Sequence, residues 1–282
     1  MRPGSSPVIV FPGAGDKALD LSIFAAPDDA ICFQTVGYPG WQRLANRGFS
    51  VDVLVSELVS QIATIVPQGP IHILGFSLGG HFGYAAALAL QARGREIASF
   101  CAIDSFIIHP SVQRSPMRRG YRMVAHDLSL LCERRFSDLS RSVRSRLYRA
   151  MIRCAGDRLP TLLLSLATAR RLPAILRYDR LFAEEVRMEL LIRLGHPWAR
   201  SLDIDPITLK APAILFRTPE SARDDEAWRR RCPGLEIFEI PGDHRTISEF
   251  FENSRNLKTI FASKITGAIR ERFLNAMRCP LR

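Results

Sequence analysis

The sequence of 282 residues contains no hydrophobic run long enough to cross a membrane. A transmembrane helix needs about 18 to 20 consecutive apolar residues, and the longest apolar runs, at residues 85–90 and 162–166, are far shorter. Near the start, residues 8–11 form an apolar stretch that Pro12 ends, which is too short for the hydrophobic segment of a signal peptide. These absences exclude a membrane-spanning protein, and we expect a cytoplasmic one without stable membrane insertion.

Cysteine is scarce and scattered. No two of the six cysteines form a C-x-x-C pair, and no histidine lies near them at the spacing of metal ligands. They are Cys32, Cys101, Cys132, Cys154, Cys232 and Cys279. The sequence therefore predicts neither a zinc site nor a disulfide scaffold, and its 47% hydrophobic content is enough to build a core of ordinary size.

Acidic residues are few relative to basic ones, 28 against 39, which gives a net charge of +11. Residues 111–205 contain 19 arginines and 10 acidic residues, so nine of the eleven excess positive charges lie there. Such an excess attracts nucleic acid, a membrane surface or an acidic protein; the simpler alternative is a solvated helical face. Part of this segment has helical spacing: its apolar stripe is Phe136, Leu139, Val143, Leu147 and Met151, and Arg141, Arg144, Arg146, Arg149 and Arg153 lie outside that stripe.

Short apolar runs alternate with helical periodicity in the first 105 residues. Strands are predicted at residues 7–11, 30–36, 71–76 and 97–103, and helices at residues 51–65 and 78–93. Further strands at 213–216 and 235–240 and a final helix at about 248–274 continue this pattern. The alternation predicts an α/β fold with a mostly parallel central sheet and helices on both faces.

The roughly hundred residues between Asp104 and the strand at 213–216 far exceed an ordinary strand-to-strand connection. Their helical pattern, punctuated by Pro160 and Pro173, indicates an inserted helical segment. We therefore predict a single domain, residues 1–282, with a helical lid insertion at about 107–208.

The most specific motif is Gly75-Phe-Ser-Leu-Gly79, a G-x-S-x-G pattern between a predicted strand and a predicted helix. A nucleophilic serine in such a sharp turn has strained backbone angles, and glycines at Gly75 and Gly79 remove side chains that would collide. The turn also leaves the backbone N–H of Leu78 free to stabilise an oxyanion. The motif indicates that Ser77 is a nucleophile; the alternative is a serine that caps an ordinary helix.

A serine hydroxyl needs a base, which we expect at the carboxyl end of a later strand. His244 fits, because it follows the strand at 235–240 in a glycine-containing loop. The other histidines lie inside a strand, on the helix after Ser77, or in the insertion, and we expect structural roles for them. They are His72, His81, His109, His126 and His196.

The acid that orients the base has two candidate positions. Asp104 ends the strand that follows the nucleophile helix, whereas Asp224 and Asp225 follow the strand at 213–216, the commoner acid position in α/β-hydrolases. The Asp224-Asp225 pair is also typical of the acidic first turn of an ordinary helix. Asp104 is flanked by apolar residues, where an unpaired carboxylate is costly and a partner such as His244 offsets the cost. We favour Asp104.

These motifs together resemble the thioesterase domains of nonribosomal peptide and polyketide synthases, a branch of the α/β-hydrolase family. The motifs that carry the resemblance are Val-Phe-Pro-Gly-Ala-Gly15, Gly-Phe-Ser-Leu-Gly-Gly80, Ala-Ile-Asp-Ser105 and Pro-Gly-Asp-His244. The resemblance covers the sheet from Val8 to about Phe251. It implies that the loop after the first strand supplies an oxyanion N–H, from Gly13 or Ala14.

The resemblance implies a serine thioesterase that releases an acyl, polyketide or peptidyl chain from a carrier protein in secondary-metabolite biosynthesis, by hydrolysis or cyclisation. Ser77 would be acylated, His244 would be the base and Asp104 would orient it. The expected partners are an acyl or peptidyl carrier protein and an acyl substrate, and not nucleic acid. The phosphopantetheine arm is part of the substrate, and no metal or redox cofactor is expected.

The inserted lid would turn its apolar stripe to the substrate or the core, and its arginines would guide an acidic carrier protein. Three alternatives remain open at this point: a carboxylesterase or lipase acting on free esters, an acyltransferase with the same triad, and a catalytically silent binding module. The acyl group and a releasing or editing role also remain open.

Overall fold

The computed structural model describes residues 7–15, 32–106, 127–168, 173, 176, 178–201, 207–244 and 246–247. The chain divides into two compact units. The sheet unit comprises residues 1–38, 50–108 and 194–282, and the helical unit comprises residues 39–49 and 109–193. Each unit is described by itself.

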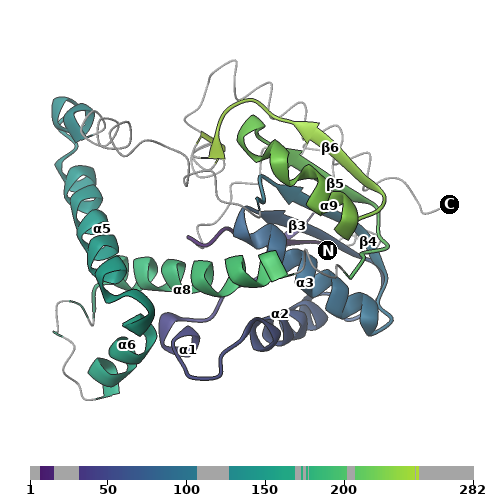
Figure 1. The fold of residues 1–282 in the computed structure, drawn as a ribbon, viewed down its shortest axis with the longest axis horizontal. Coiled ribbons are helices and arrows are strands. Elements are labelled where there is room, and N and C mark those ends of the chain that lie inside the picture. The colour runs from purple at the N-terminus through teal and green to yellow at the C-terminus, as the bar shows by residue number, and fades with distance from the viewer. Residues whose placement is uncertain are drawn as a thin grey trace. The chain divides into compact units, whose positions relative to one another are not determined.

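Within the described residues, six strands form one sheet in which all neighbouring strands run parallel, in the order β2-β1-β3-β4-β5-β6 (Figure 1). Their bounds are β1 (Val8–Phe11), β2 (Phe33–Thr35), β3 (Ile71–Phe76), β4 (Ile97–Ile103), β5 (Ala213–Arg217) and β6 (Leu235–Glu239). The predicted fold class is confirmed, and the predicted strands match these bounds to within a few residues.

The central strands are buried on both faces. Every residue of β1 and β3 is buried, whereas the edge strands β2 and β6 are partly exposed. Parallel strands covered on both faces are typically continuous apolar runs, which explains why β1 and β3 were predictable from short β-branched segments.

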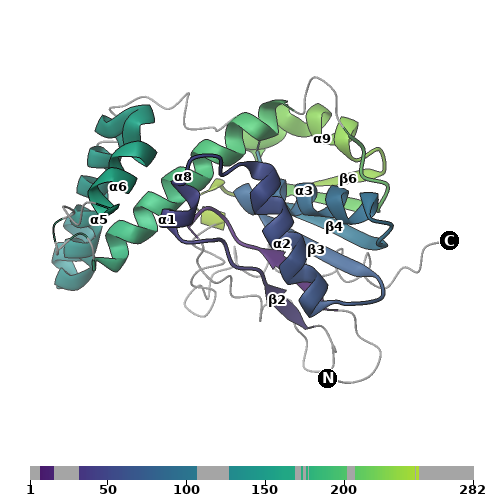
Figure 2. The same cartoon turned by 90° about the horizontal axis from the view of Figure 1, so that it is seen from below.

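The helices α2 (Val51–Ile65), α3 (Leu78–Ala92) and α9 (Asp225–Arg231) lie on the same face of the sheet (Figures 1 and 2). The helix α2 begins at Ser50, whose side chain accepts a hydrogen bond from the Val53 N–H at 3.3 Å. Trp228 of α9 stacks on His81 of α3, with ring centroids 5.3 Å apart, so α9 and α3 lie side by side. The final helix predicted at about 248–274 lies outside the described residues.

The helical unit contains α1 (Trp41–Leu44), α5 (Phe136–Ala155), the short 3₁₀ helix η3 (Gly156–Arg158), α6 (Leu159–Thr168) and the first part of α8 (Arg180–Ser201). The predicted insertion at 107–208 supplies most of this unit, although residues 39–49 also belong to it and residues 194–208 belong to the sheet unit. The assignment of the whole chain to one domain stays a prediction.

Four of the five apolar residues in the predicted stripe of α5 are exposed, so the stripe does not face a core in the part of the chain that the structure describes. Phe136 and Leu147 of that stripe are 63% and 59% exposed, and Val143 and Met151 are exposed as well. The helix instead buries Tyr148 and Ile152. The other expectation, that the stripe faces substrate, stays a prediction.

Arginines of α5 form ion pairs with acidic residues of the same unit. Arg144 pairs with Asp179, and Arg149 lies 3.7 Å from Glu185, and both of these acidic side chains are buried. The Tyr148 hydroxyl also donates to Asp179. The arginine-rich face of α5 is therefore not only solvated: part of it packs against buried acidic side chains.

No helix in the described part of the chain is both long and apolar enough to cross a membrane.

Helix α3 approaches the end of β4 closely at Gly80. A Cβ atom placed on Gly80 would overlap the Ser105 hydroxyl and would lie 2.6 Å from Ser105 Cβ. Because no real Cβ atom tolerates such a distance, only glycine permits this packing between the nucleophile turn and the residue after Asp104.

We therefore predict that Gly80→Ala destabilises the protein by about 3 kcal/mol, the upper end of the usual cost of overpacking. Thermal unfolding measures the loss. Ser105→Gly in the same chain should restore part of the stability, because it removes both colliding atoms. The control is Gly234→Ala, at an exposed glycine where an added methyl group would meet no atom within 4 Å. Equal melting temperatures for Gly80→Ala and Gly234→Ala would contradict the close approach.

Candidate active site

Ser77 occupies the sharp turn between β3 and α3. Its backbone angles, φ 53° and ψ −123°, are unusual for a residue other than glycine. Its N–H donates to the Ile103 carbonyl at 2.8 Å, which ties the turn to β4. A Cβ atom on Gly75 would lie 2.6 Å from the Gly79 carbonyl oxygen, and one on Gly79 would overlap the carbonyl oxygen of Phe11. Both glycines are thus needed for the turn, as the motif predicts.

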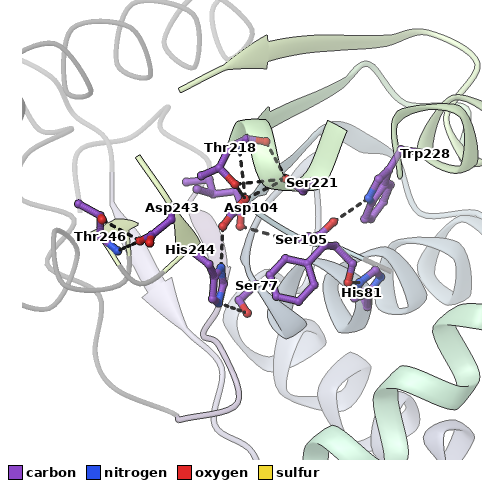
Figure 3. Close-up of polar contacts among 12 residues, drawn as sticks. Ser77, His81, Asp104, Ser105, Thr218, Ser221, Trp228, Asp243, His244 and Thr246 are labelled. Atoms are coloured by element: carbon purple, nitrogen blue, oxygen red, sulfur yellow. Dashed lines mark hydrogen bonds and ion pairs between the residues drawn. The ribbon is translucent and has the colours of Figure 1, made fainter. Parts of the chain in front are cut away.

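His244 lies beside Ser77 although 167 positions separate them in the sequence. Its Nε2 is 3.1 Å from Ser77 Oγ (Figure 3). The imidazole stacks on the Phe76 ring at 5.6 Å between centroids and meets the edge of Phe106 at 4.7 Å. Asp243 accepts hydrogen bonds from the N–H and hydroxyl of Thr246, at 2.9 and 2.8 Å, which fixes the turn that carries the imidazole.

Asp104 completes the cluster from the end of β4. Its side chain is fully buried, and Oδ2 lies 2.6 Å from His244 Nδ1. The residue has a positive φ of 45°, and its N–H donates to the Phe216 carbonyl at 2.7 Å. The sheet thus holds the acid in a strained conformation whose side chain points to the imidazole.

Hydrogen bonding keeps the Asp104 carboxylate charged. Burial by itself raises the pKa of this carboxyl, but the hydrogen bond and positive charge available from His244, together with the N–H and hydroxyl of Thr218, outweigh burial and lower the pKa below its usual range. The carboxylate is therefore ionised at neutral pH, which is the form that can accept the Nδ1 proton of His244.

The structure does not bring the alternative acids to His244. Asp225 pairs with Arg217, with Nε and Oδ1 2.8 Å apart, and Asp224 is the residue that precedes α9. Thr218 and Ser221 take the place after β5, and each donates to Asp104 Oδ1. Sequence reasoning missed these two hydroxyls, and no motif marks them.

The loop after β1 lies against the nucleophile turn. A Cβ atom on Gly13 would lie 3.6 Å from Ser77 Cβ, so the backbone of this residue passes close to the nucleophile. The Tyr38 hydroxyl donates to the Pro12 carbonyl at 2.7 Å and holds the loop there. The chain runs from β1 to β2 on one side and then returns to β3 on the other side of β1, so the strand order reverses between β1 and β3. Parallel α/β folds bind ligands at the carboxyl ends of the strands at such a reversal, which is where this loop lies.

Two other histidines have structural surroundings, as expected. His81 Nε2 lies 3.1 Å from the Phe106 carbonyl, which only accepts, so this nitrogen carries the proton. Burial lowers the pKa of His81 to about 3, and the ring is therefore neutral. His72 Nδ1 lies 2.8 Å from Ser99 Oγ between β3 and β4. His109 and His126 lie outside the described residues.

A family model described as "Thioesterase domain" matches residues 7–265. The chain belongs to the thioesterase domain family. This confirms the family that the motifs around Ser77, Asp104 and His244 suggested.

Solved thioesterase domains share the fold. The NocB thioesterase domain from the nocardicin cluster is 17% identical, with a TM-score of 0.56 and coverage of 96% of this chain and 94% of that chain. A Vlm2 thioesterase domain bound with a dodecadepsipeptide is 20% identical, with a TM-score of 0.54 and coverage of 100% and 96%. At these identities the likeness shows the α/β-hydrolase fold of a thioesterase.

Related sequences occur in synthases. A dimodular nonribosomal peptide synthase of Bacillus subtilis (strain 168) is 37% identical over 60 residues, which is 21% of this thioesterase and 2% of the synthase. Microperfuranone synthase of Emericella nidulans is 28% identical over 106 residues, which is 36% of this chain and 11% of that protein. The thioesterase thus spans only a small part of the length of these relatives.

We predict that acid weakens the protein partly through Asp104. A carboxyl whose pKa is lowered by folding stabilises the protein above its ordinary pKa of about 3.9, and this contribution is lost as the pH falls through the folded value. Between about pH 5 and about pH 3, the free energy of unfolding of wild type should therefore fall more steeply than that of Asp104→Asn.

Urea unfolding at several pH values measures the two slopes. Asp157→Asn, at a fully exposed aspartate of the helical unit, is the control and should follow wild type. Parallel curves for wild type and Asp104→Asn would contradict the stabilised carboxylate.

Proposed function

We propose that this thioesterase releases an acyl, polyketide or peptidyl chain from a phosphopantetheine carrier protein through an ester on Ser77. The observation that carries the proposal is the continuous path of contacts from Ser77 Oγ to His244 Nε2, at 3.1 Å, and from His244 Nδ1 to Asp104 Oδ2, at 2.6 Å. This is the order of contacts that a nucleophile, a base and an orienting acid require.

In the first half of the proposed reaction, Ser77 Oγ attacks the thioester carbonyl carbon while His244 Nε2 takes the hydroxyl proton. The backbone N–H groups of Leu78 and of Gly13, or of Ala14 instead of Gly13, stabilise the oxyanion. Collapse of the tetrahedral intermediate breaks the C–S bond, and His244 returns its proton to the leaving thiolate of the carrier arm. Asp104 holds the imidazole and stabilises its protonated form.

In the second half, His244 accepts a proton from water or from a hydroxyl or amine of the acyl chain itself. That nucleophile attacks the ester carbonyl, and Ser77 leaves with a proton from His244. Water gives a free acid, and an internal nucleophile gives a ring. Every proton in this cycle passes through His244, so the proposed chemistry requires no cofactor.

The proposed partner follows from the family and from charge. The matched relatives are synthases. Nine of the eleven excess positive charges lie in residues 111–205, which suits an acidic carrier protein. The proposal includes neither nucleic acid nor membrane as a partner, and it includes the cytoplasmic location expected from the sequence.

We predict that Ser77→Ala and His244→Ala each lower thioester turnover by about 10⁴-fold, as is usual when one member of such a unit is removed. Intact-protein mass spectrometry after incubation with acylated carrier proteins should detect the acyl ester on wild type and not on Ser77→Ala. A fluorophosphonate probe should likewise label wild type and not Ser77→Ala.

Asp104→Asn should cause a large loss as well, and Asp225→Asn, at the acid that pairs with Arg217, is its matched control. An acyl or phosphonate adduct on Ser77→Ala would disprove the proposed nucleophile. Rapid cleavage of p-nitrophenyl esters with no turnover of carrier-bound thioesters would favour an esterase, and product formed only with an added alcohol or amine would favour an acyltransferase.

We predict that only arginines without buried acidic partners guide the carrier. Arg153 and Arg158 are exposed, whereas Arg144 and Arg149 pair with buried Asp179 and Glu185. Arg153→Glu with Arg158→Glu should raise KM for a carrier-bound thioester, and the effect should shrink with added salt, because charges are screened beyond about 10 Å at 0.1 M.

A small uncharged thioester is the control substrate, and its kcat/KM should not change in that variant. Arg144→Glu with Arg149→Glu should instead impair both substrates, since it places glutamates beside buried acids. Equal loss on both substrates in the Arg153 and Arg158 variant would contradict electrostatic guidance of the carrier.

A further inference from the structure

The two oxygens of the Asp104 carboxylate have different partners. Oδ2 faces His244 Nδ1, whereas Oδ1 faces the segment that follows β5 (Figure 3). Oδ1 accepts hydrogen bonds from the Thr218 N–H at 3.1 Å, the Thr218 hydroxyl at 2.9 Å and the Ser221 hydroxyl at 3.0 Å. Thr218 directly follows β5, and Ser221 lies in the short 3₁₀ helix η4 (Pro219–Asp224).

Both hydroxyl side chains are buried, with Thr218 1% and Ser221 3% exposed, so bulk water does not compete for these bonds. The single hydroxyl proton of Ser221 has two other acceptors within reach, the Thr218 carbonyl oxygen at 3.1 Å and, at the longer distance of 3.5 Å, the Thr218 hydroxyl oxygen. That carbonyl already accepts from the Ser221 N–H at 3.1 Å, and a carboxylate is the stronger acceptor. The Ser221 hydroxyl proton therefore points to Asp104.

We propose that Thr218 and Ser221 are positioning residues that direct Asp104 Oδ2 to His244 and moderate the basicity of the carboxylate. The inference rests on the proposed function, because it assigns these hydroxyls to the same Ser77, His244 and Asp104 unit. Neither side chain touches the reacting atoms.

The first effect is geometric. A carboxylate is free to rotate about its Cβ–Cγ bond, and rotation would exchange the oxygen that faces the imidazole. Three donors on Oδ1 oppose that rotation, since it would leave buried donors without an acceptor. The acid consequently keeps one oxygen in line with His244 Nδ1 throughout the cycle.

The second effect is electrostatic. Donors on Oδ1 place partial positive charge beside the carboxylate, which weakens its attraction for the imidazolium. If both hydroxyls are removed, Asp104 holds the imidazolium more strongly. Loss of the hydroxyls should therefore change the pH dependence of Ser77 reactivity as well as its rate.

The test is the rate constant of fluorophosphonate labelling of Ser77 as a function of pH, which needs no carrier protein. Thr218→Val with Ser221→Ala removes both hydroxyls and keeps the Thr218 N–H. Labelling at neutral pH should slow by about tenfold or more, the factor that one or two ordinary hydrogen bonds represent. The acid limb of the profile should move to higher pH, and Thr218→Ser with native Ser221 should restore both rate and profile.

The matched control is Ser99→Ala, which removes a buried serine hydroxyl bonded to His72 Nδ1 five residues before Asp104. This variant should have a lower melting temperature but the wild-type pH profile of labelling. The inference would be overturned if the double variant were labelled at the wild-type rate. It would also be overturned if labelling were equally slow at every pH and Thr218→Ser with native Ser221 did not restore it. Wild-type protein that labels normally but turns over no thioester would contradict the proposed function and not the positioning role.

Discussion

Burial of one carboxylate, that of Asp104, governs the arrangement of the whole site. A fully buried charge costs several kcal/mol unless hydrogen bonds and an opposite charge offset it. Asp104 meets that cost with donors from three directions: the imidazole of His244, the backbone N–H of Thr218, and the hydroxyls of Thr218 and Ser221. Thr218 and Ser221 follow β5, and His244 follows β6, so all of these donors lie outside β4. The buried charge therefore holds the segments after β5 and β6 to the end of β4.

The sheet makes these long-range contacts possible because it aligns the ends of its parallel strands. The Ser77 N–H bonds to the last residue of β4, and the Asp104 N–H bonds to Phe216 of β5, so the nucleophile and the acid are fixed by ordinary sheet hydrogen bonds. Behind them, His81 and the Trp228 indole bond to the carbonyls of Phe106 and Ser105. These buried contacts hold the segment after Asp104 in place, and with it the Phe106 ring that borders His244.

The sequence predicted those elements whose determining residues lie close together along the chain. Strands β3 and β4 and helix α2 follow from apolar runs and three-to-four spacing, and Ser77 follows from glycines that a tight turn requires. Thr218 and Ser221 could not be predicted, because hydroxyl residues are common in loops and only the sheet brings these two to Asp104. The face that α5 buries could not be predicted either, for a related reason. Its buried face contacts Asp179 and Glu185, acids that lie 31 to 40 residues further along the chain and that the spacing within α5 does not reveal.

An acid at the end of β4 changes what the segment after β5 must provide. When the acid itself follows β5, that segment carries the charge; here it supplies an N–H and two hydroxyls to a charge on the neighbouring strand. Both arrangements put a carboxylate within reach of a histidine after β6. In the arrangement seen here Asp104 adopts a positive φ, which costs of order 1–3 kcal/mol for such a residue. The hydrogen bonds to Thr218 and Ser221 act on the strained residue itself, and this is why their contribution extends from holding the fold to orienting the base.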